Sequence, residues 1–361
     1  FSMFFGAGNL IFPPFLGEQA GNQAIIAGLG FIVSAVGLPV LGVIAVAKAD
    51  GLNTLASRVH PRFADLFTLL IYLSIGPCLA IPRTASTSYE MVIAPFFTQQ
   101  FKFVPILYSF AFFALALYLA LNPEKLSDRL GKVLCPLLLT LITIIFLGSF
   151  FVEIHYAMPS GNYAQHQFVQ GFLDGYQTMD TLAAIVFSDI ILKSIRKDKN
   201  LSEKQEFSFL IQTSIIAIGG LAIVYGGLGF IGSTVTNILP SGTGSVDLLT
   251  SIVKLLLGNF GKIILAICVT GACITIGLTA TVADYFSDLT KISYEKLAII
   301  TTIISIIFAM FGVDIIIKLA VPVLVFLYPI AIALIFLNIL KNKIKNDNIF
   351  LGTVIGAGII S

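Results

Sequence analysis

The stretch that decides the fold is FSMFFGAGNLIFPPF, residues Phe1–Phe15, an apolar segment interrupted by a Gly-Ala-Gly-Asn sequence and followed by two prolines. A bilayer offers no water to satisfy exposed backbone N–H and C=O groups, so membrane helices seldom contain such interruptions. Secondary transporters use discontinuous helices of this kind to build ion and substrate sites at mid-membrane depth. On its own the segment is equally compatible with glycines that let two helices pack closely.

The composition identifies a polytopic membrane protein. Apolar residues make up 57% of the 361 residues and charged residues 11%, with a mean hydropathy of +0.98. Ordinary soluble domains carry about 25% charged residues. The three histidines all lie in expected loops, and no Ser-His-Asp grouping, Walker loop or nucleotide fingerprint appears. We therefore expect neither an enzyme nor an ATP-driven pump, with no cofactor and no nucleic-acid partner.

Apolar runs of about 20 residues predict ten spans and the start of an eleventh. The residues 241–257 are too few to span and predict an external loop with a short helix. The predicted spans are Phe1–Leu16, Ala24–Ala47, Ala64–Ala94, Val104–Leu121, Leu130–Val152, Phe168–Ile195, Phe207–Ile231, Phe260–Leu289, Leu297–Gly312 and Ile315–Leu340, with the eleventh beginning near Ile349.

The distribution of basic residues orients these spans. Of the 21 Lys and Arg residues, only Lys102, Lys254, Lys262 and Lys318 fall in loops on one side and Arg83 within a span, which leaves 16 on the other side. Cytoplasmic loops carry the excess of Lys and Arg. The pattern predicts a multi-pass protein of the cell membrane with a cytoplasmic N-terminus and a first span that runs outward.

The polar stretch 153–167 divides the chain into two groups of five spans. Because five is odd, the second group enters the membrane in the opposite sense, which predicts an inverted repeat. The expected units are a first repeat at 1–152, an external linker at 153–167, a second repeat at 168–340 and an additional helix at 341–361. An inverted repeat requires the sixth span to be broken like the first, and polar residues interrupt it between Asp174 and Asp180. This second break favours a transporter over a packing motif.

The two breaks supply candidate binding groups. Half-helix N-termini offer N–H groups to anions, so the amides of Ala7, Gly8 and Asn9 could hold a substrate carboxylate. The opposite half-helix ends offer carbonyls to cations. The carbonyls of Ser2 and Phe5 and the side-chain oxygen of Asn9 could therefore ligate a small hard cation.

Further candidates lie in later spans. The eighth contains Thr279 and Thr281, whose hydroxyls could complete an oxygen-only cation site, although threonine hydroxyls more often bond the i−4 carbonyl. Asp180 is the foremost intramembrane charge. Arg83 and Glu90 lie two turns apart on one predicted helix and could form an ion pair or gate.

Five ordered motifs resemble the bacterial branched-chain amino acid:cation symporter family, and the likeness covers essentially the whole chain. They are FFGAGNLIFPPFLGEQAG (4–21), GPCLAIPRTAS (76–86), GYQTMDTLAA (175–184), GLTATVADYF (277–286) and VPVLVFLYP (321–329). The resemblance implies the all-α, five-plus-five inverted-repeat fold of the amino acid–polyamine–organocation superfamily, with discontinuous first and sixth helices. It also implies uptake of leucine, isoleucine and valine, usually with sodium, so the expected partners are this substrate, the ion and the bilayer.

The resemblance also implies roles for individual residues. Residues 6–9 look like the unwound segment that grips the substrate carboxylate, with Asn9 near a sodium ion. The carbonyls of Ser2, Phe5 and Ile276 and the hydroxyl of Thr279 resemble the ligands of the widely shared sodium site. The next position is Ala280, where related symporters often have Ser or Thr, and Thr281 is the alternative ligand. The residues expected to face the substrate ammonium and side chain are Gly175, Tyr176, Thr178, Met179 and Asp180.

Two alternatives to sodium symport remain open on the sequence alone. Protons could drive uptake, with Asp180 or Asp284 as the carrier. The chain could also be a receptor of the same fold that binds the amino acid without moving it. A channel is disfavoured because no charge ring or filter repeat is present.

Overall fold

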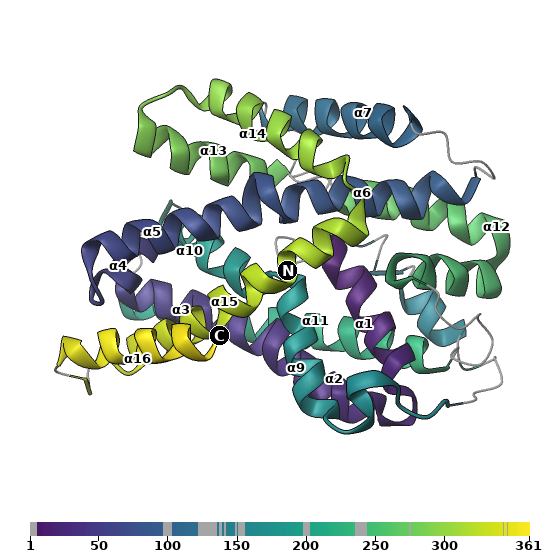
Figure 1. Ribbon diagram of the computed structural model, residues 1–361, viewed down its shortest axis with the longest axis horizontal. Helices are drawn as coiled ribbons and strands as arrows, with labels where there is room; N and C mark the ends of the chain where they lie inside the picture. Colours follow the sequence, from purple (N-terminus) through teal and green to yellow (C-terminus); the bar gives the residue numbers. More distant parts are fainter. Residues whose placement is uncertain are drawn as a thin grey trace.

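The computed structural model describes residues 6–96, 103–121, 156–197, 203–234, 244–273, 276–341, 343–344 and 346–361, and from 136 to 150 all but 137, 138, 141 and 149. Every regular element in these residues is a helix (Figure 1), which confirms the all-α prediction. Six of the described helical segments are long and apolar enough to cross a membrane.

The first half of the chain follows the predicted spans, with two irregular turns inside them. The second span contains a π-helical turn, and the third bends at Gly76 (φ −91°, ψ −127°), just before Pro77. The predicted fifth span lies mostly outside the described residues. The elements are α1 (Ala7–Ala20), α2 (Ala24–Ile32), η3 (Val33–Gly37), α3 (Leu38–Ala49), α4 (Leu52–Ser57), α5 (Pro61–Leu73), η4 (Ser74–Cys78), α6 (Ala80–Val92) and α7 (Phe103–Ala120).

The second half contains the predicted break in the sixth span, where α9 ends and α10 begins. The predicted short helix within 241–257 forms the first part of α12, which turns at Gly258 (φ 65°, ψ −155°). The elements are α9 (Gln167–Gly175), η7 (Tyr176–Thr178), α10 (Asp180–Lys197), α11 (Glu203–Thr234), α12 (Ser245–Cys273), α13 (Ile276–Thr290), α14 (Tyr294–Ala309), α15 (Val313–Ile339) and α16 (Asp347–Ile360).

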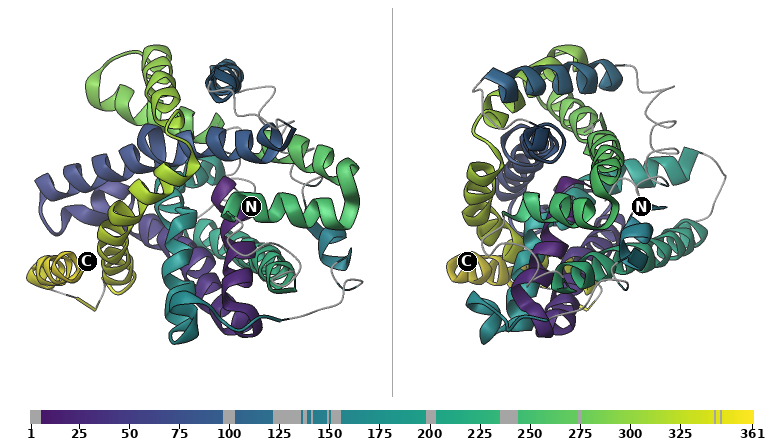
Figure 2. Two further views of the ribbon diagram at one scale, coloured as in Figure 1. Left: turned by 45° about the vertical axis from the view of Figure 1, so that its right-hand side comes forward. Right: turned by 90° about the vertical axis from the view of Figure 1, so that its right-hand side faces the viewer.

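The helices form two groups on either side of the third span. In Figure 1, α1, α2, α9 and α11 gather below the line of α5 and α6, whereas α7, α13 and α14 lie above it, and Figure 2 shows the same separation. The main contacts in the lower group join α1 to α11 and α2 to α9. Both broken spans therefore pack chiefly against helices of the other half of the chain.

Glycines make these two helix pairs unusually close. A Cβ at Gly17 of α1 would lie 1.9 Å from the carbonyl oxygen of Gly229, and one at Gly232 of α11 would lie 1.9 Å from that of Pro14. Small residues at such positions let membrane helices approach until backbone touches backbone.

The pair α2–α9 repeats the same arrangement. A Cβ at Gly30 would lie 2.1 Å from the carbonyl oxygen of Phe168, and one at Gly171 would lie 2.0 Å from that of Ala27. In all four helices the contacted carbonyl precedes the glycine by three residues. An inverted repeat that exchanges the first span with the sixth and the second with the seventh relates these two pairs to each other.

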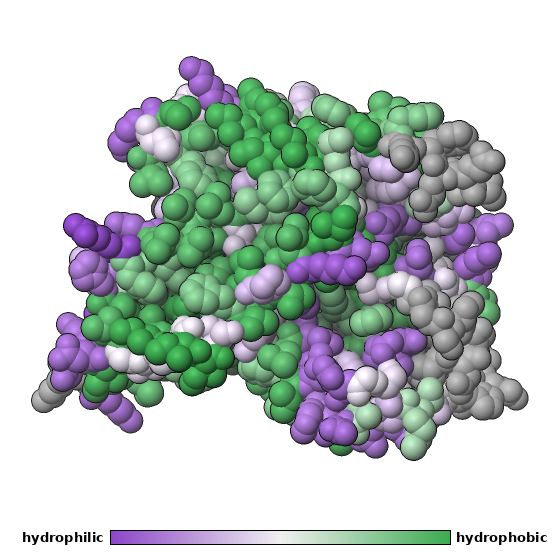
Figure 3. Space-filling view, viewed as in Figure 1, coloured by the Kyte–Doolittle hydropathy of each residue, from purple (hydrophilic) through white to green (hydrophobic). Residues whose placement is uncertain are grey.

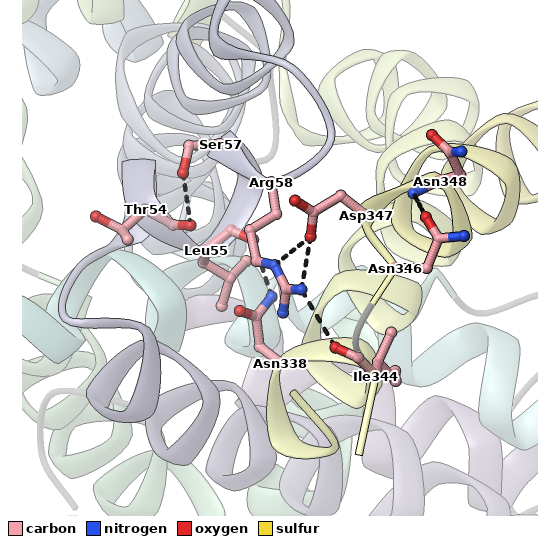
Figure 4. Close-up of polar contacts among 9 residues, drawn as sticks. All are labelled: Thr54, Leu55, Ser57, Arg58, Asn338, Ile344, Asn346, Asp347 and Asn348. Atoms are coloured by element: carbon pink, nitrogen blue, oxygen red, sulfur yellow. Dashed lines mark hydrogen bonds and ion pairs between the residues drawn. The ribbon is translucent and has the colours of Figure 1, made fainter. Parts of the chain in front are cut away.

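A polar cluster joins the C-terminal end of α4 to α15, to the segment after it and to the start of α16 (Figure 4). Arg58 donates to the Asp347 carboxylate at 2.6 Å and to the Ile344 carbonyl, and Asn338 donates to the Leu55 carbonyl at 2.8 Å. Asn338 is buried, whereas Asp347 is exposed. The cluster lies on the side that the charge pattern predicts to be cytoplasmic.

The surface is apolar over a broad band. Figure 3 shows apolar side chains across α5, α14 and α15, with polar side chains toward the left, lower and right edges and in a small group near the centre. Exposed residues of α14 include Ile299, Ile303 and Ile307. A patch of this extent suits lipid acyl chains rather than water.

We expect Gly232→Ala to destabilise the protein by about 1–3 kcal/mol, the usual cost of overpacking. Its Cβ would meet the backbone of α1, which cannot rotate away as a side chain can. Gly226→Ala is the matched control on α11, since nothing lies within 4 Å of a Cβ there and alanine favours the helix by about 1 kcal/mol. Thermal unfolding in detergent measures both variants, and equal midpoints would contradict the proposed role of the close contact.

Candidate functional site

The break in the sixth span is a short irregular turn between two helices. The α-helix ends at Gly175, η7 continues to Thr178, Met179 takes a left-handed conformation (φ 63°), and α10 begins at Asp180. A positive φ is uncommon for a residue other than glycine and marks a backbone held in place by its surroundings. The prediction of a discontinuous sixth helix is confirmed.

The described part of the first span begins at its predicted break. Gly6 is extended (φ −126°, ψ −174°), and the helix starts at Ala7. The Gly6 amide donates to Oδ1 of Asn9 at 3.3 Å, and the Asn9 amide donates to the Gly6 carbonyl at 3.2 Å. The N–H groups of Ala7 and Gly8 belong to the first turn, where a helix provides no internal acceptor. Ser2 and Phe5, predicted as cation ligands, lie outside the described residues.

A buried hydrogen-bond network joins the two breaks. Nδ2 of Asn9 donates to Oδ2 of Asp180 at 2.9 Å and also to the Tyr225 hydroxyl, which in turn donates to the same Oδ2 at 2.8 Å. All three side chains are less than 5% exposed. The network therefore fixes α1, α10 and α11 relative to one another.

Tyr225 is a site residue that the sequence analysis missed. It is a single tyrosine in the apolar helix α11, and its ring packs edge-on against Phe31 at 5.5 Å between centroids. A lone hydroxyl in an apolar span needs a polar partner. That requirement could have marked Tyr225 as a candidate site residue, but sequence spacing does not reveal which residues it contacts.

Arg83 also reaches the sixth-span break. It donates from Nη1 to the Gln177 carbonyl at 2.6 Å and from Nη2 to the Thr178 carbonyl at 3.4 Å. The suggested pair with Glu90 is wrong, because the Glu90 carboxylate instead accepts from the Val313 amide. Both residues lie on α6, but the Arg83 side chain reaches across to η7 and the Glu90 side chain to the start of α15.

Gly8 lies where α1, α6 and η7 meet. A Cβ at this position would lie 2.8 Å from Nη2 of Arg83 and 3.2 Å from Cα of Thr178. The absent side chain brings the first turn of α1 directly against the guanidinium group. The structure thus assembles the predicted substrate residues Gly8, Asn9, Thr178 and Asp180.

Aromatic and apolar groups line the other side of η7. Tyr176 stacks on Tyr328 of α15 with centroids 4.1 Å apart, and Met179 is buried beside the same helices. Glycine is required at position 175 because a Cβ there would lie 2.7 Å from the Cβ of Ser34. These residues give the break an apolar wall.

The predicted cation ligands of the eighth span occupy the first turns of α13. The Thr281 hydroxyl donates to the Gly277 carbonyl at 2.7 Å, the ordinary i−4 bond. Thr279 is buried, and the residue four positions before it, Thr275, lies outside the described residues. Ile276 begins the helix. Both threonines are buried near the start of α13, and a hydroxyl that donates one hydrogen bond still has lone pairs for a cation.

A cavity of about 390 Å³ lies between α1, α2 and α11 and borders the network at Tyr225. Its walls include Pro13, Phe31 and Phe230. Ile25, also in its lining, is 79% exposed, so the cavity opens on an apolar side of the protein.

Comparison with known proteins identifies the family. The model of the family described as branched-chain amino acid transport protein matches residues 1–361. The chain belongs to this family. It is 39% identical to the branched-chain amino acid permease BraB of Bacillus subtilis, over 100% of this chain and 83% of the permease. It is also 39% identical to the branched-chain amino acid transport system 2 carrier protein of Pseudomonas aeruginosa, over 94% and 78% of the two chains. Membership makes it a membrane transport protein and not an enzyme, as predicted.

Solved structures confirm the predicted fold class. The nucleobase-cation-symport-1 transporter MHP1 matches all of this chain and 89% of its own, with a TM-score of 0.60 and 12% identity. An Eremococcus coleocola manganese transporter matches 99% of this chain and 84% of its own, with a TM-score of 0.61 and 15% identity. The five-plus-five fold with discontinuous first and sixth helices is thus shared, whereas the division at 153–167 stays a prediction.

We expect Tyr225→Phe to weaken leucine binding about 10- to 100-fold, because a hydrogen bond to a charged group contributes about 1.5–3 kcal/mol. The change keeps the ring contact with Phe31 and removes only the hydroxyl that links Asn9 to Asp180. Tyr156→Phe, at an exposed residue, is the control. Calorimetric titration of purified protein with leucine measures the effect, and equal affinities for both variants would refute a binding role for the network.

Proposed function

We propose that this protein takes up leucine, isoleucine and valine across the bacterial cell membrane, coupled to sodium, by alternating access. The observation that carries the proposal is the Asn9–Asp180 hydrogen bond, which joins the unwound start of α1 to the broken sixth span in a member of this family. Helix breaks at mid-membrane depth are where transporters of this architecture place their substrates and ions.

The breaks offer complementary groups to a zwitterionic substrate. The open amides of Ala7 and Gly8 suit a carboxylate, and the Asp180 carboxylate suits an ammonium group. Tyr176 and Met179 provide apolar surface for an aliphatic side chain. A pocket of this kind separates isoleucine from valine only modestly, since one methylene is worth about 1–3 kcal/mol. One carrier for three substrates follows from that small difference.

The sodium part of the proposal is supported by the burial of Thr279 and Thr281 in the first turns of α13 and by the resemblance there. Sodium accepts neutral oxygen ligands, and Thr279 is only 3% exposed. Ser2, Phe5 and Ile276 would add carbonyl oxygens, with Thr281 as the alternative hydroxyl. We also propose a cytoplasmic N-terminus, from the distribution of basic residues.

Alternating access requires some helices to move against others. The close glycine contacts join α1 to α11 and α2 to α9, so neither broken span can rock without its partner. We propose that these four helices move together against the group formed by α7, α13 and α14. Ion and substrate favour occlusion because each improves the binding of the other.

Proton coupling is the second candidate, and one observation favours it. Asp180 is a carboxylate that is 4% exposed at the break, where it accepts hydrogen bonds from Asn9 and Tyr225. Intramembrane carboxylates commonly form proton relays. Protonation of this group would weaken its attraction for an ammonium group and could release the substrate.

The sodium proposal predicts that an inward sodium gradient stimulates uptake of labelled leucine into proteoliposomes and that Thr279→Ala reduces the stimulation at least about tenfold, since each 1.4 kcal/mol of lost cation binding is tenfold. Thr281→Ala is the matched control two residues along α13, because its hydroxyl already bonds Gly277. Equal uptake with and without sodium would rule out the coupling. A larger loss of sodium stimulation in Thr281→Ala than in Thr279→Ala would instead assign the ion to Thr281.

Asp180→Asn separates the two coupling modes. The amide is close in size to the carboxylate but does not titrate, so under proton coupling a pH gradient no longer drives leucine accumulation. Leucine exchange then persists only at higher leucine concentrations, because the neutral amide attracts the ammonium group less. Under sodium coupling a sodium gradient drives wild-type uptake and a pH gradient alone drives none. Uptake under each gradient, in wild type and variant, assigns the ion.

A further inference from the structure

The carbonyl groups of the sixth-span break all have protein donors. A helix leaves its last four carbonyls without internal partners. Here the Gly175 carbonyl accepts from the Thr178 hydroxyl at 2.9 Å and the Tyr176 carbonyl from the Met179 amide at 3.0 Å. The carbonyls of Gln177 and Thr178 accept from the guanidinium group of Arg83 at 2.6 and 3.4 Å.

The guanidinium group belongs to another span and is buried. Arg83 is 3% exposed, and its Cζ lies 5.6 Å from the ring centroid of Phe12 on α1, within the range of a cation–π contact. Nη2 also lies against Gly8. A permanent positive charge therefore sits between the first turn of α1 and the C-terminal end of η7.

In discontinuous membrane helices, such carbonyl ends are the groups that coordinate a sodium ion or proton. We propose that Arg83 is a tethered cation that fills this position at the sixth-span break, so that no free ion binds there and one sodium ion accompanies each substrate. The inference deepens the proposed sodium coupling, and its stoichiometry rests on that coupling.

The charges of the site agree with this assignment. Arg83 and Asp180 carry opposite charges and are both less than 5% exposed. A buried charge needs a compensating partner, and these two side chains leave the break formally neutral before any ion enters. One sodium ion bound with a zwitterionic amino acid then moves a single positive charge across the membrane.

A merely structural role for Arg83 makes a different prediction. If its hydrogen bonds alone mattered, a neutral donor such as glutamine would serve nearly as well as lysine, and no soluble cation would replace the lost side chain. If the charge matters, lysine serves better than glutamine, and a free cation can enter the space that alanine leaves.

The test measures leucine affinity of the purified full chain in Arg83→Ala, with sodium alone and with added millimolar guanidinium. We expect the affinity to fall about 100-fold, as for removal of one partner of a buried charge pair, and guanidinium to restore it at least about tenfold. Arg58→Ala is the matched control. Its guanidinium also contacts a carbonyl and an aromatic ring, but in the cluster near α16, so neither the substitution nor guanidinium should change leucine affinity.

A second pair of variants keeps the test decisive if Arg83→Ala does not fold. The leucine affinity of Arg83→Lys should stay within about tenfold of the wild-type value, since lysine keeps the charge. This affinity should rise with the first power of sodium concentration, as in wild type. Arg83→Gln should bind more weakly than Arg83→Lys. The proposal is overturned if Arg83→Gln and Arg83→Lys bind leucine with equal affinity, or if leucine binding by Arg83→Lys depends on a second sodium ion. It is also overturned if guanidinium does not increase the leucine affinity of folded Arg83→Ala. Wild-type binding without any sodium dependence would refute the sodium coupling, while guanidinium rescue would still report on Arg83.

Discussion

The structure depends on one constraint: backbone groups exposed where a helix breaks inside an apolar protein must find partners within that protein. At the sixth-span break the partners come from the break itself and from Arg83 on the third span. At the start of α1 the Asn9 side chain accepts from Gly6 and also reaches Asp180. The groups that satisfy the breaks therefore also bring three spans together around a single site.

Much of this arrangement could be predicted because membrane insertion leaves strong local signals. Apolar length located the spans, basic loops oriented them, and the polar residues between Asp174 and Asp180 marked the second break. The contacts between spans were not predictable in the same way. Tyr225 and Arg83 act on residues far away in the chain, and Arg83 was assigned a neighbour on its own helix because spacing along one helix was the only geometry available. The bend at Gly76 within the third span was also missed.

The glycines illustrate the same limit. The chain has 31 glycines, and composition alone does not distinguish those in close helix contacts from those that face open space. In the structure Gly226 faces open space, whereas Gly232, two turns along the same helix, touches the backbone of α1. Gly17, Gly30 and Gly171 share that close contact, and they bind the first two spans to the sixth and seventh. The mobile unit that we propose is thus defined by four positions without side chains.

These contacts also join helices that are made at different times during synthesis. The glycine face of α1 finds its partner on α11 only after about 200 further residues have been made, which at about 5–20 residues per second takes roughly 10–40 s. During that interval the close-packing surface of α1 is uncovered, and that of α2 is uncovered until α9 has been made, about 140 residues after Gly30. The first half of the chain therefore exposes to lipid the same glycine faces that later become its closest internal contacts.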